Sequence, residues 1–315
     1  MKLTYYAHDG ITEISPEELP QHLTTFEGAV WVDMQVTAEE GVTLLREVFR
    51  FHELAIEDVL NQEQRPKAEE FADYLFIILN PVTFTGGNLK SRELDVFVGK
   101  NYVVTAHLNT EPIIAEAQRR IIHGKLPFDI SATYLLYTLL DSVVDSYLPV
   151  LESIENELDE LGNQLLDRPD RGAQTRMFQL KDCLNTLWWI TWPQKDILSL
   201  LINHDRVFID PRSQYYVRDV DDHLSRVTQG VQAARETITG FTNLYVTAVS
   251  NQLNMAVNRL TVITVMVGVM AVITGFYGMN FEHTLPPFDA AWGVPFVVVV
   301  MGAASATIYG LIYRR

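Results

Sequence analysis

The chain has 315 residues, 48% of them hydrophobic, and carries 24 Lys and Arg against 40 Asp and Glu, a formal net charge of −16. This sign argues against a non-specific binder of nucleic acid or of anionic lipid, because both need clustered basic side chains, and it makes cations the more natural partners. The single cysteine, Cys183, excludes an intramolecular disulfide and a zinc cage built from cysteines.

The first part of the chain, residues 1–130, is predicted to be an α/β domain. Short runs rich in β-branched and aromatic residues alternate there with amphipathic stretches typical of helices. The expected strands are 29–32, 75–79, 94–98 and 102–105, and the expected helices are 39–51 and 52–60.

Strand signals end at Pro112, and residues 131–210 are predicted to form an acidic helical hairpin. One helix is expected over 131–166 and a second over 176–202, with a turn at Pro169. For any single acid in this hairpin a solvated helix face is the simpler interpretation. Together the acids would raise the local cation concentration; they are Asp141, Asp145, Glu152, Glu155, Glu157, Asp159 and Glu160.

Residues 211–259 are predicted to form a stalk helix, because apolar positions follow one another at alternating steps of three and four. Two interpretations remain open: packing within one chain, or a parallel bundle of stalks from several chains. The positions of this seam are Val217, Val220, Leu224, Val227, Val231, Ala234, Ile238, Phe241, Tyr245, Ala248, Gln252 and Met255.

Two later segments, 260–281 and 290–313, contain no charged residue and are each long enough to cross a bilayer as a helix. They predict two transmembrane helices joined by an outer loop at 282–289. Basic residues flank the pair at Arg259, Arg314 and Arg315, whereas the loop has none. The positive-inside rule therefore places both termini in the cytoplasm.

One face of the first predicted span is small or polar at helical spacing, while the opposite face is bulky and apolar. Close helix packing explains such a face, and so does the lining of a pore. Because two spans cannot enclose a water-filled path, a pore would require an oligomer. The residues of this face are Asn254, Val257, Thr261, Thr264, Gly268, Ala271 and Gly275.

The first span ends in Gly278-Met279-Asn280, after a long uninterrupted helix and before a short acidic loop. With the segments 52–61, 64–67, 216–223 and 250–254, this ending resembles the CorA family of divalent-cation transporters over essentially the whole chain. The chain departs from the family pattern at Gly268, where a bulky residue is common.

The resemblance implies a funnel-shaped homopentamer with an α/β cytoplasmic domain, a long helical stalk and two C-terminal transmembrane helices. It implies a selectivity filter at Gly278, Met279 and Asn280, in which Asn280 contacts the hydration shell of the ion, and an apolar constriction at Leu260. It also implies a cytoplasmic regulatory divalent ion held by Asp219. The expected function is passive uptake of hydrated Mg²⁺ across a prokaryotic plasma (inner) membrane, with Mg²⁺ as transported and regulatory ion and no organic cofactor.

Two alternatives stay open. A Zn²⁺, Co²⁺ or Ni²⁺ transporter of the same superfamily is one, and His283 beside the filter would suit a softer ion. A non-conducting, membrane-anchored sensor of divalent ions is the other, although a simple anchor needs no small and polar face. No catalytic motif or Gly-rich phosphate loop is present, so an enzyme is not expected.

Overall fold

The computed structural model describes residues 1–7, 10–24, 28–36, 39–62, 64–109, 111–123, 131–167, 170–203, 214–279 and 291–313. Asn280, the predicted outer loop with His283, and Arg314 and Arg315 therefore lie outside the described residues. The chain divides into two units, Met1–Thr242 and Asn243–Arg315.

A seven-stranded sheet organises the first unit, with strand order β2-β1-β3-β9-β8-β5-β4. Only β3 and β9 pair in parallel among the described pairs of this sheet; the other neighbours are antiparallel. The strands are β1 (Lys2–Ala7), β2 (Gly10–Glu13), β3 (Gly28–Gln35), β4 (Lys67–Glu70), β5 (Leu75–Leu79), β8 (Leu94–Val98) and β9 (Tyr102–His107). The predicted strands 75–79 and 94–98 are thus confirmed.

A separate hairpin joins β6 (Val82–Thr85) to β7 (Asn88–Ser91). Gly86 and Gly87 form its two-residue turn, and both have positive φ, 60° and 78°. Turns of this kind match the twist of the strands but need left-handed residues at both positions, which glycine adopts without steric cost.

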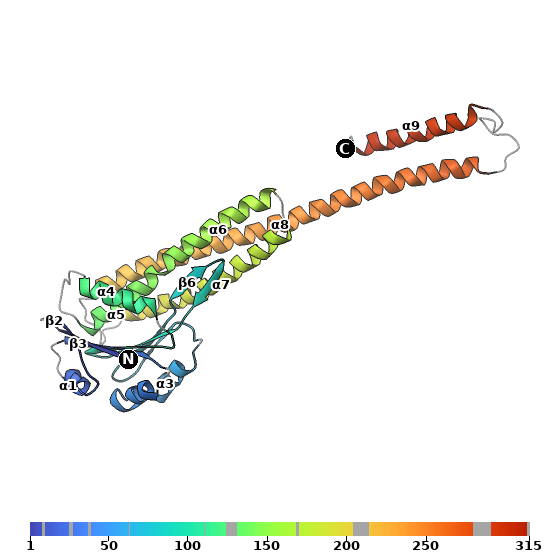
Figure 1. The fold of residues 1–315 in the computed structure, drawn as a ribbon. Helices are drawn as coiled ribbons and strands as arrows, with labels where there is room; N and C mark the ends of the chain where they lie inside the picture. Colours follow the sequence, from blue (N-terminus) through green and yellow to red (C-terminus); the bar gives the residue numbers. More distant parts are fainter. Residues whose placement is uncertain are drawn as a thin grey trace. The chain divides into compact units, whose positions relative to one another are not determined.

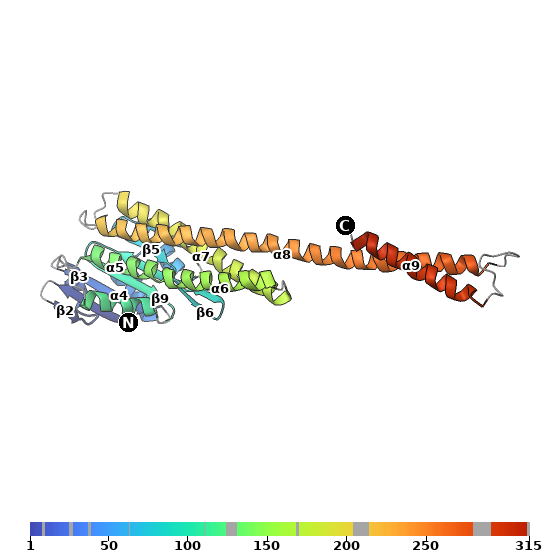
Figure 2. The ribbon, with the colours of Figure 1, turned by 90° about the horizontal axis from the view of Figure 1, so that it is seen from above.

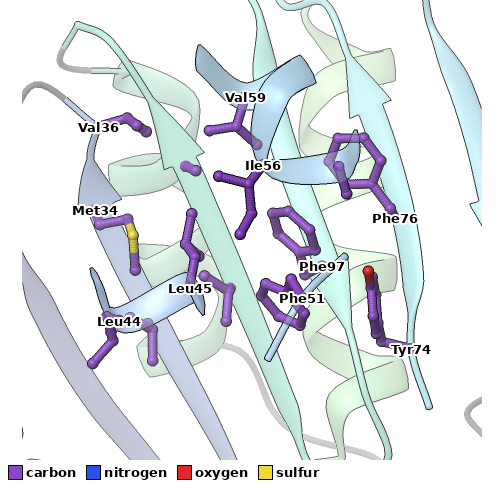
Figure 3. Close-up of a cluster of buried hydrophobic side chains, with 14 of the residues drawn as sticks. Met34, Val36, Leu44, Leu45, Phe51, Ile56, Val59, Tyr74, Phe76 and Phe97 are labelled. Atoms are coloured by element: carbon purple, nitrogen blue, oxygen red, sulfur yellow. The ribbon is translucent and has the colours of Figure 1, made fainter. Parts of the chain in front are cut away.

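Helices cover both faces of the sheet (Figure 1). One face packs against α1 (Leu19–Thr24), α2 (Glu39–Thr43), the π-helical turn η1 (Leu44–Val48) and α3 (Glu53–Leu60). The other face packs against α5 (Ala132–Asp145), and α4 (Pro112–His123) packs against α5. Successive strand residues point to opposite faces of the sheet. Phe76 on β5 and Phe97 on β8 point to the face that η1 and α3 cover, and they belong to the core there (Figure 3).

The single helix predicted over 131–166 is wrong, because the structure has α5 and then α6 (Tyr147–Asp167), separated at Ser146. Pro149 has no N–H to donate to the carbonyl of Asp145, so the helical hydrogen-bond pattern is interrupted here. The Ser146 hydroxyl donates to the carbonyl of Val143 at 2.6 Å. The helix α4 was not predicted at all. The second arm of the hairpin is α7 (Arg171–Asn203).

The seam of the predicted stalk lies on α8 (Gln214–Tyr277), and its first seven residues, Val217 to Ile238, are buried within the chain itself. α6 and α7 lie beside this part of α8 (Figure 2). A Cβ on Gly230 would come within 2.5 Å of Leu151 on α6, and Arg235 lies 4.9 Å above the Trp188 ring on α7. Of the two interpretations left open by the sequence, the structure supports packing within one chain for these seven positions.

In the second unit, α9 (Gly293–Tyr313) runs alongside the last part of α8 in the opposite direction (Figure 1, Figure 2). Two segments, Tyr215–Tyr277 and Gly293–Gly310, are helical and contain a stretch apolar and long enough to cross a membrane. In both, only 6% of that stretch is buried within the chain, which distinguishes them from core helices of a globular protein.

Asp95 on β8 is a fully buried acid, and this burial, with the negative charges of Glu93 and Asp58, raises its pKa well above the usual value. The folded state therefore holds this proton more tightly than the unfolded chain, whose Asp titrates near pH ~3.9. The resulting stability is fully present below that pH and is lost as the pH rises through the folded-state pKa.

We expect Asp95→Asn to raise the melting temperature at about pH 8 and to flatten its decrease between about pH 5 and 8. Asp73→Asn, at an exposed position, is the matched control and should leave the profile unchanged. Thermal melts of the full-length protein across this range check the prediction, and parallel profiles for Asp95→Asn and the parent would contradict it.

Candidate functional site

The predicted pore-lining residues all lie on α8, and all are exposed in the single chain. No proline interrupts α8 between Gln214 and Tyr277, so one helix presents the whole face. The Thr261 hydroxyl donates to the carbonyl of Val257 at 2.9 Å, which leaves its oxygen free to accept from water. The exposed residues are Asn254, Val257, Leu260, Thr261, Thr264, Gly268, Ala271 and Gly275.

The less exposed side of the same helix segment is apolar. Its partly or fully buried residues are Val262, Met266, Val269, Met270, Ile273 and Tyr277. α9 is the neighbouring helix in this unit, so these six residues mark the side of α8 that faces it. The residues of the small and polar face are exposed, and so are the bulky residues Ile263, Val265, Val267 and Val272.

The end of α8 leads directly into the predicted filter. The Gly278 N–H donates to the carbonyl of Thr274 at 2.8 Å, and the Met279 N–H donates to that of Phe276 at 3.3 Å. The Met279 side chain is 55% exposed. The structure thus places Gly278 and Met279 at the helix C-terminus, whereas Asn280 lies outside the described residues.

A group of possible metal ligands lies between α5 and α8 in the first unit, and we name it the carboxylate cluster: Asp141, Asp145 and His223. One ligand atom from each residue lies within 4.8 Å of the others, and the structure's described part contains no other group of three such side chains that meets this geometry. Two carboxylates and one imidazole suit Mg²⁺ through oxygen and Zn²⁺, Co²⁺ or Ni²⁺ through nitrogen.

Arg120 on α4 neutralises part of the carboxylate cluster. Its Nη1 lies 2.6 Å from Asp141 Oδ2, and its Nη2 lies 2.7 Å from Asp145 Oδ2. Burial raises the pKa of Asp141, and repulsion from Asp145 adds to the rise while Arg120 opposes it. A bound cation would favour the charged carboxylate, so cation binding and proton release are coupled here.

Asp219, the predicted regulatory ligand, is exposed on α8 one helical turn before His223. It is close enough for its charge to raise the pKa of Tyr137 and of Asp141, both on α5, where burial is the larger cause. The structure thus brings Asp219 into the neighbourhood of the carboxylate cluster.

The role of Asp141, Asp145 and His223 as one group was missed in the sequence. Both pairs, 141/145 and 219/223, have the i, i+4 spacing that puts two side chains on one face of a helix. This spacing was the available signal. The packing of α5 on α8, shown by the Tyr137 and Tyr216 rings at 5.2 Å between centroids, was not visible in the sequence.

Comparison with known proteins agrees with this architecture. The family model described as "CorA-like Mg2+ transporter protein" matches residues 26–315. The cobalt/magnesium transport protein CorA of Thermotoga maritima is 33% identical over 279 residues, which are 87% of this chain and 79% of that protein. The divalent cation transporter CmaX of Pseudomonas aeruginosa is 22% identical over 294 residues, 92% of this chain and 87% of that protein.

Among solved structures, the complete CorA magnesium transporter from Methanocaldococcus jannaschii superposes with a TM-score of 0.84 at 21% identity, covering 100% of this chain and 98% of that one. This likeness shows the same fold: an N-terminal α/β domain, a long helix and two C-terminal apolar helices. The match of the family model and the 33% identity to a relative together show the family. The chain belongs to the CorA-like Mg²⁺ transporter family.

Proposed function

We propose that this CorA-family transporter is a channel-like homopentamer that carries hydrated Mg²⁺ passively into the cytoplasm. The observation that carries the proposal is the small and polar face of α8, every residue of which is exposed in the single chain. Five copies of this face around a common axis would line a water-filled path. Leu260, 64% exposed, would form an apolar constriction along it.

The filter would recognise Mg²⁺ through its water shell. Mg²⁺ dehydrates reluctantly, so a ring of neutral Asn280 amide oxygens at the end of α8 can contact the hydrated ion without removing its water. A divalent ion gains about 4.6 kcal/mol per 100 mV of inside-negative potential, twice the value for one charge. The potential alone is a sufficient driving force.

The membrane would be a prokaryotic plasma (inner) membrane, with both termini in the cytoplasm. Arg259 precedes the first span and Arg314 and Arg315 follow the second, whereas the loop between the spans has no Lys or Arg. The α/β domain and the carboxylate cluster would then face the cytoplasm, where they can sense the transported ion.

For regulation, we propose that a cytoplasmic divalent ion binds at Asp219 and that this binding disfavours conduction. The supporting observation is that Asp219 lies beside the carboxylate cluster and shares its electrostatic field with Asp141. The Arg120 guanidinium already donates hydrogen bonds to Asp141 and Asp145, so a cation that binds these carboxylates has to displace the guanidinium or share the carboxylate oxygens with it.

We expect Asp219→Ala to raise the Mg²⁺ concentration that protects the cytoplasmic part against trypsin by about tenfold or more, since the variant removes one negatively charged ligand, and tenfold corresponds to about 1.4 kcal/mol of binding free energy. Asp222→Ala, three residues further along α8 and also exposed, is the matched control. Equal protection of the Asp219→Ala protein and the parent would remove Asp219 from the regulatory site.

Zn²⁺, Co²⁺ or Ni²⁺ is the competing candidate for the transported ion. The imidazole of His223 in the carboxylate cluster and His283 in the outer loop favour softer divalent ions, and the Thermotoga relative is named for cobalt as well as magnesium. Flux of Mg²⁺, Zn²⁺, Co²⁺ and Ni²⁺ into liposomes containing the purified protein tests this. Faster flux of Zn²⁺, Co²⁺ or Ni²⁺ than of Mg²⁺ would favour the competing candidate, and no flux of any of the four would favour a non-conducting sensor.

A further inference from the structure

A cavity of about 420 Å³ lies in the first unit, away from α8 and from the carboxylate cluster. It is lined by the segment that follows α3, by the ends of β5, β7 and β8, by the segment after β9 and by α7. The proposed ion path uses none of these elements. The Gln64-Arg65-Pro66 sequence contributes to the wall, so one of the motifs noted in the sequence lies here without a role in conduction.

Two buried side-chain amide atoms of residues that line this cavity lack hydrogen-bond partners among the described residues. They are the Asn80 carbonyl oxygen Oδ1, on a residue only 7% exposed, and the Gln62 amide nitrogen Nε2. Buried polar atoms without partners are rare in folded proteins, because each has lost its water. A ligand that brings one donor and one acceptor would satisfy both atoms.

The two arginines of the cavity offer further donors. Arg65 stacks on Trp189 of α7, with 4.4 Å from Cζ to the ring centroid, and has no carboxylate partner among the residues that the structure describes. Arg92 donates through Nη1 to Glu111 Oε1 at 3.3 Å, which leaves most of its guanidinium available. A planar guanidinium held by an aromatic ring is suited to bind a carboxylate through two parallel hydrogen bonds.

Two acids balance these arginines. Glu93 is 5% exposed and accepts from the Gln64 N–H at 2.6 Å, and Glu111 is also 5% exposed. Burial and the charge of Glu93 raise the pKa of the neighbouring Asp95. Burial also raises the pKa of Glu111, and the charge of Arg92 opposes this rise. The wall of the cavity thus carries two basic and two acidic side chains, which disfavours a ligand with a large net charge of either sign.

We propose that this cavity binds a free α-amino acid with an apolar side chain. The carboxylate of the ligand would bind Arg65 and the Gln62 amide, and its ammonium group would donate to Glu93 and to Asn80 Oδ1. The side chain would pack against Leu108, Trp189 and Ile190, which also line the cavity. A zwitterion is the ligand class that satisfies both charges and both unpartnered amides at once.

Other occupants fit less well. A nucleotide would bring two or more negative charges next to Glu93 and Glu111, and a divalent cation would be repelled by Arg65 and Arg92. The experiment below distinguishes a nucleotide and a divalent cation from an amino acid.

The test is calorimetric titration of the full-length protein in detergent, at fixed free Mg²⁺, with L-leucine, L-methionine and L-phenylalanine. We expect saturable binding of at least one of the three. For leucine, 4-methylpentanoate lacks the ammonium group and 3-methylbutylamine lacks the carboxylate, and each should bind at least about tenfold more weakly. Arg65→Gln should weaken amino-acid binding to a similar extent.

The matched control is Arg235→Gln, which removes the guanidinium above the neighbouring Trp188 and should leave binding unchanged. The proposal is overturned if none of the three amino acids binds, if the two truncated analogues bind as tightly as leucine, or if Arg65→Gln binds like the parent. Displacement of the amino acid by AMP or by Mn²⁺ at lower concentration would assign the cavity to a nucleotide or a cation instead. Because the readout is binding and not flux, failure here is separate from failure of the ion path.

Discussion

Replacing Asn280 by alanine is expected to lower Mg²⁺ flux into liposomes by at least about tenfold, because hydrogen bonds to charged groups contribute ~1.5–3 kcal/mol each. In the proposed pentamer every subunit loses its amide at the same level of the pore. The methyl group that replaces it cannot accept from the water shell of the ion. The measurement is the initial rate of fluorescence change of a Mg²⁺ indicator trapped in the liposomes.

The control for this variant is Asn185→Ala on α7, which removes an amide of the same type far along the sequence from the filter. Its flux should equal that of the parent. If Asn280→Ala also conducts like the parent, the amide ring is not the element that admits the ion. Recognition would then have to lie at another level of α8.

The second large effect is expected in the α/β domain, where Phe97 is fully buried and stacks on Phe51 at 4.0 Å between ring centroids. Tyr74 and Phe76 contact the same ring from the side of β5 (Figure 3). Phe97→Ala removes this central ring and leaves a cavity. We expect a loss of ~3–5 kcal/mol in the free energy of unfolding.

Phe178→Ala on α7 is the matched control, because that ring is 50% exposed and its removal should cost little. Urea unfolding of the full-length protein in detergent, followed by tryptophan fluorescence, compares the two variants. Equal midpoints for Phe97→Ala and Phe178→Ala would contradict the assignment of Phe97 to the core.

The elements that could be predicted from sequence are those whose pattern depends on local chemistry. β5 is a continuous apolar run and β8 is apolar except for Asp95; all residues of both strands are buried, and their bounds were predicted correctly. The break between α5 and α6 depends on one missing N–H at Pro149, which a helical pattern of apolar residues does not reveal. β4, with the sequence Lys-Ala-Glu-Glu, has no strand signal of its own and forms by pairing with β5.

The candidate site residues also fall into those with a local sequence pattern and those that depend on tertiary contacts. The small and polar face of α8 was visible as a spacing, and the structure shows it exposed on one helix. For the α8 seam from Val217 to Ile238 the sequence left two interpretations open, since a heptad pattern does not say which helix covers it; the structure shows these residues buried within the chain. The carboxylate cluster depends on α5 packing against α8, a tertiary contact between residues far apart in the sequence, and no local pattern contains that information.

Influx of Mg²⁺ driven by potential alone is the measurement that tests the central claim most directly. Purified protein in liposomes, with an inside-negative potential set by K⁺ and valinomycin, no pH gradient and no nucleotide, should admit Mg²⁺ at a rate that falls when the potential is reversed. A trapped indicator reports the flux. No Mg²⁺ influx under the inside-negative potential, or influx only when a pH gradient is added, would contradict passive conduction by this chain.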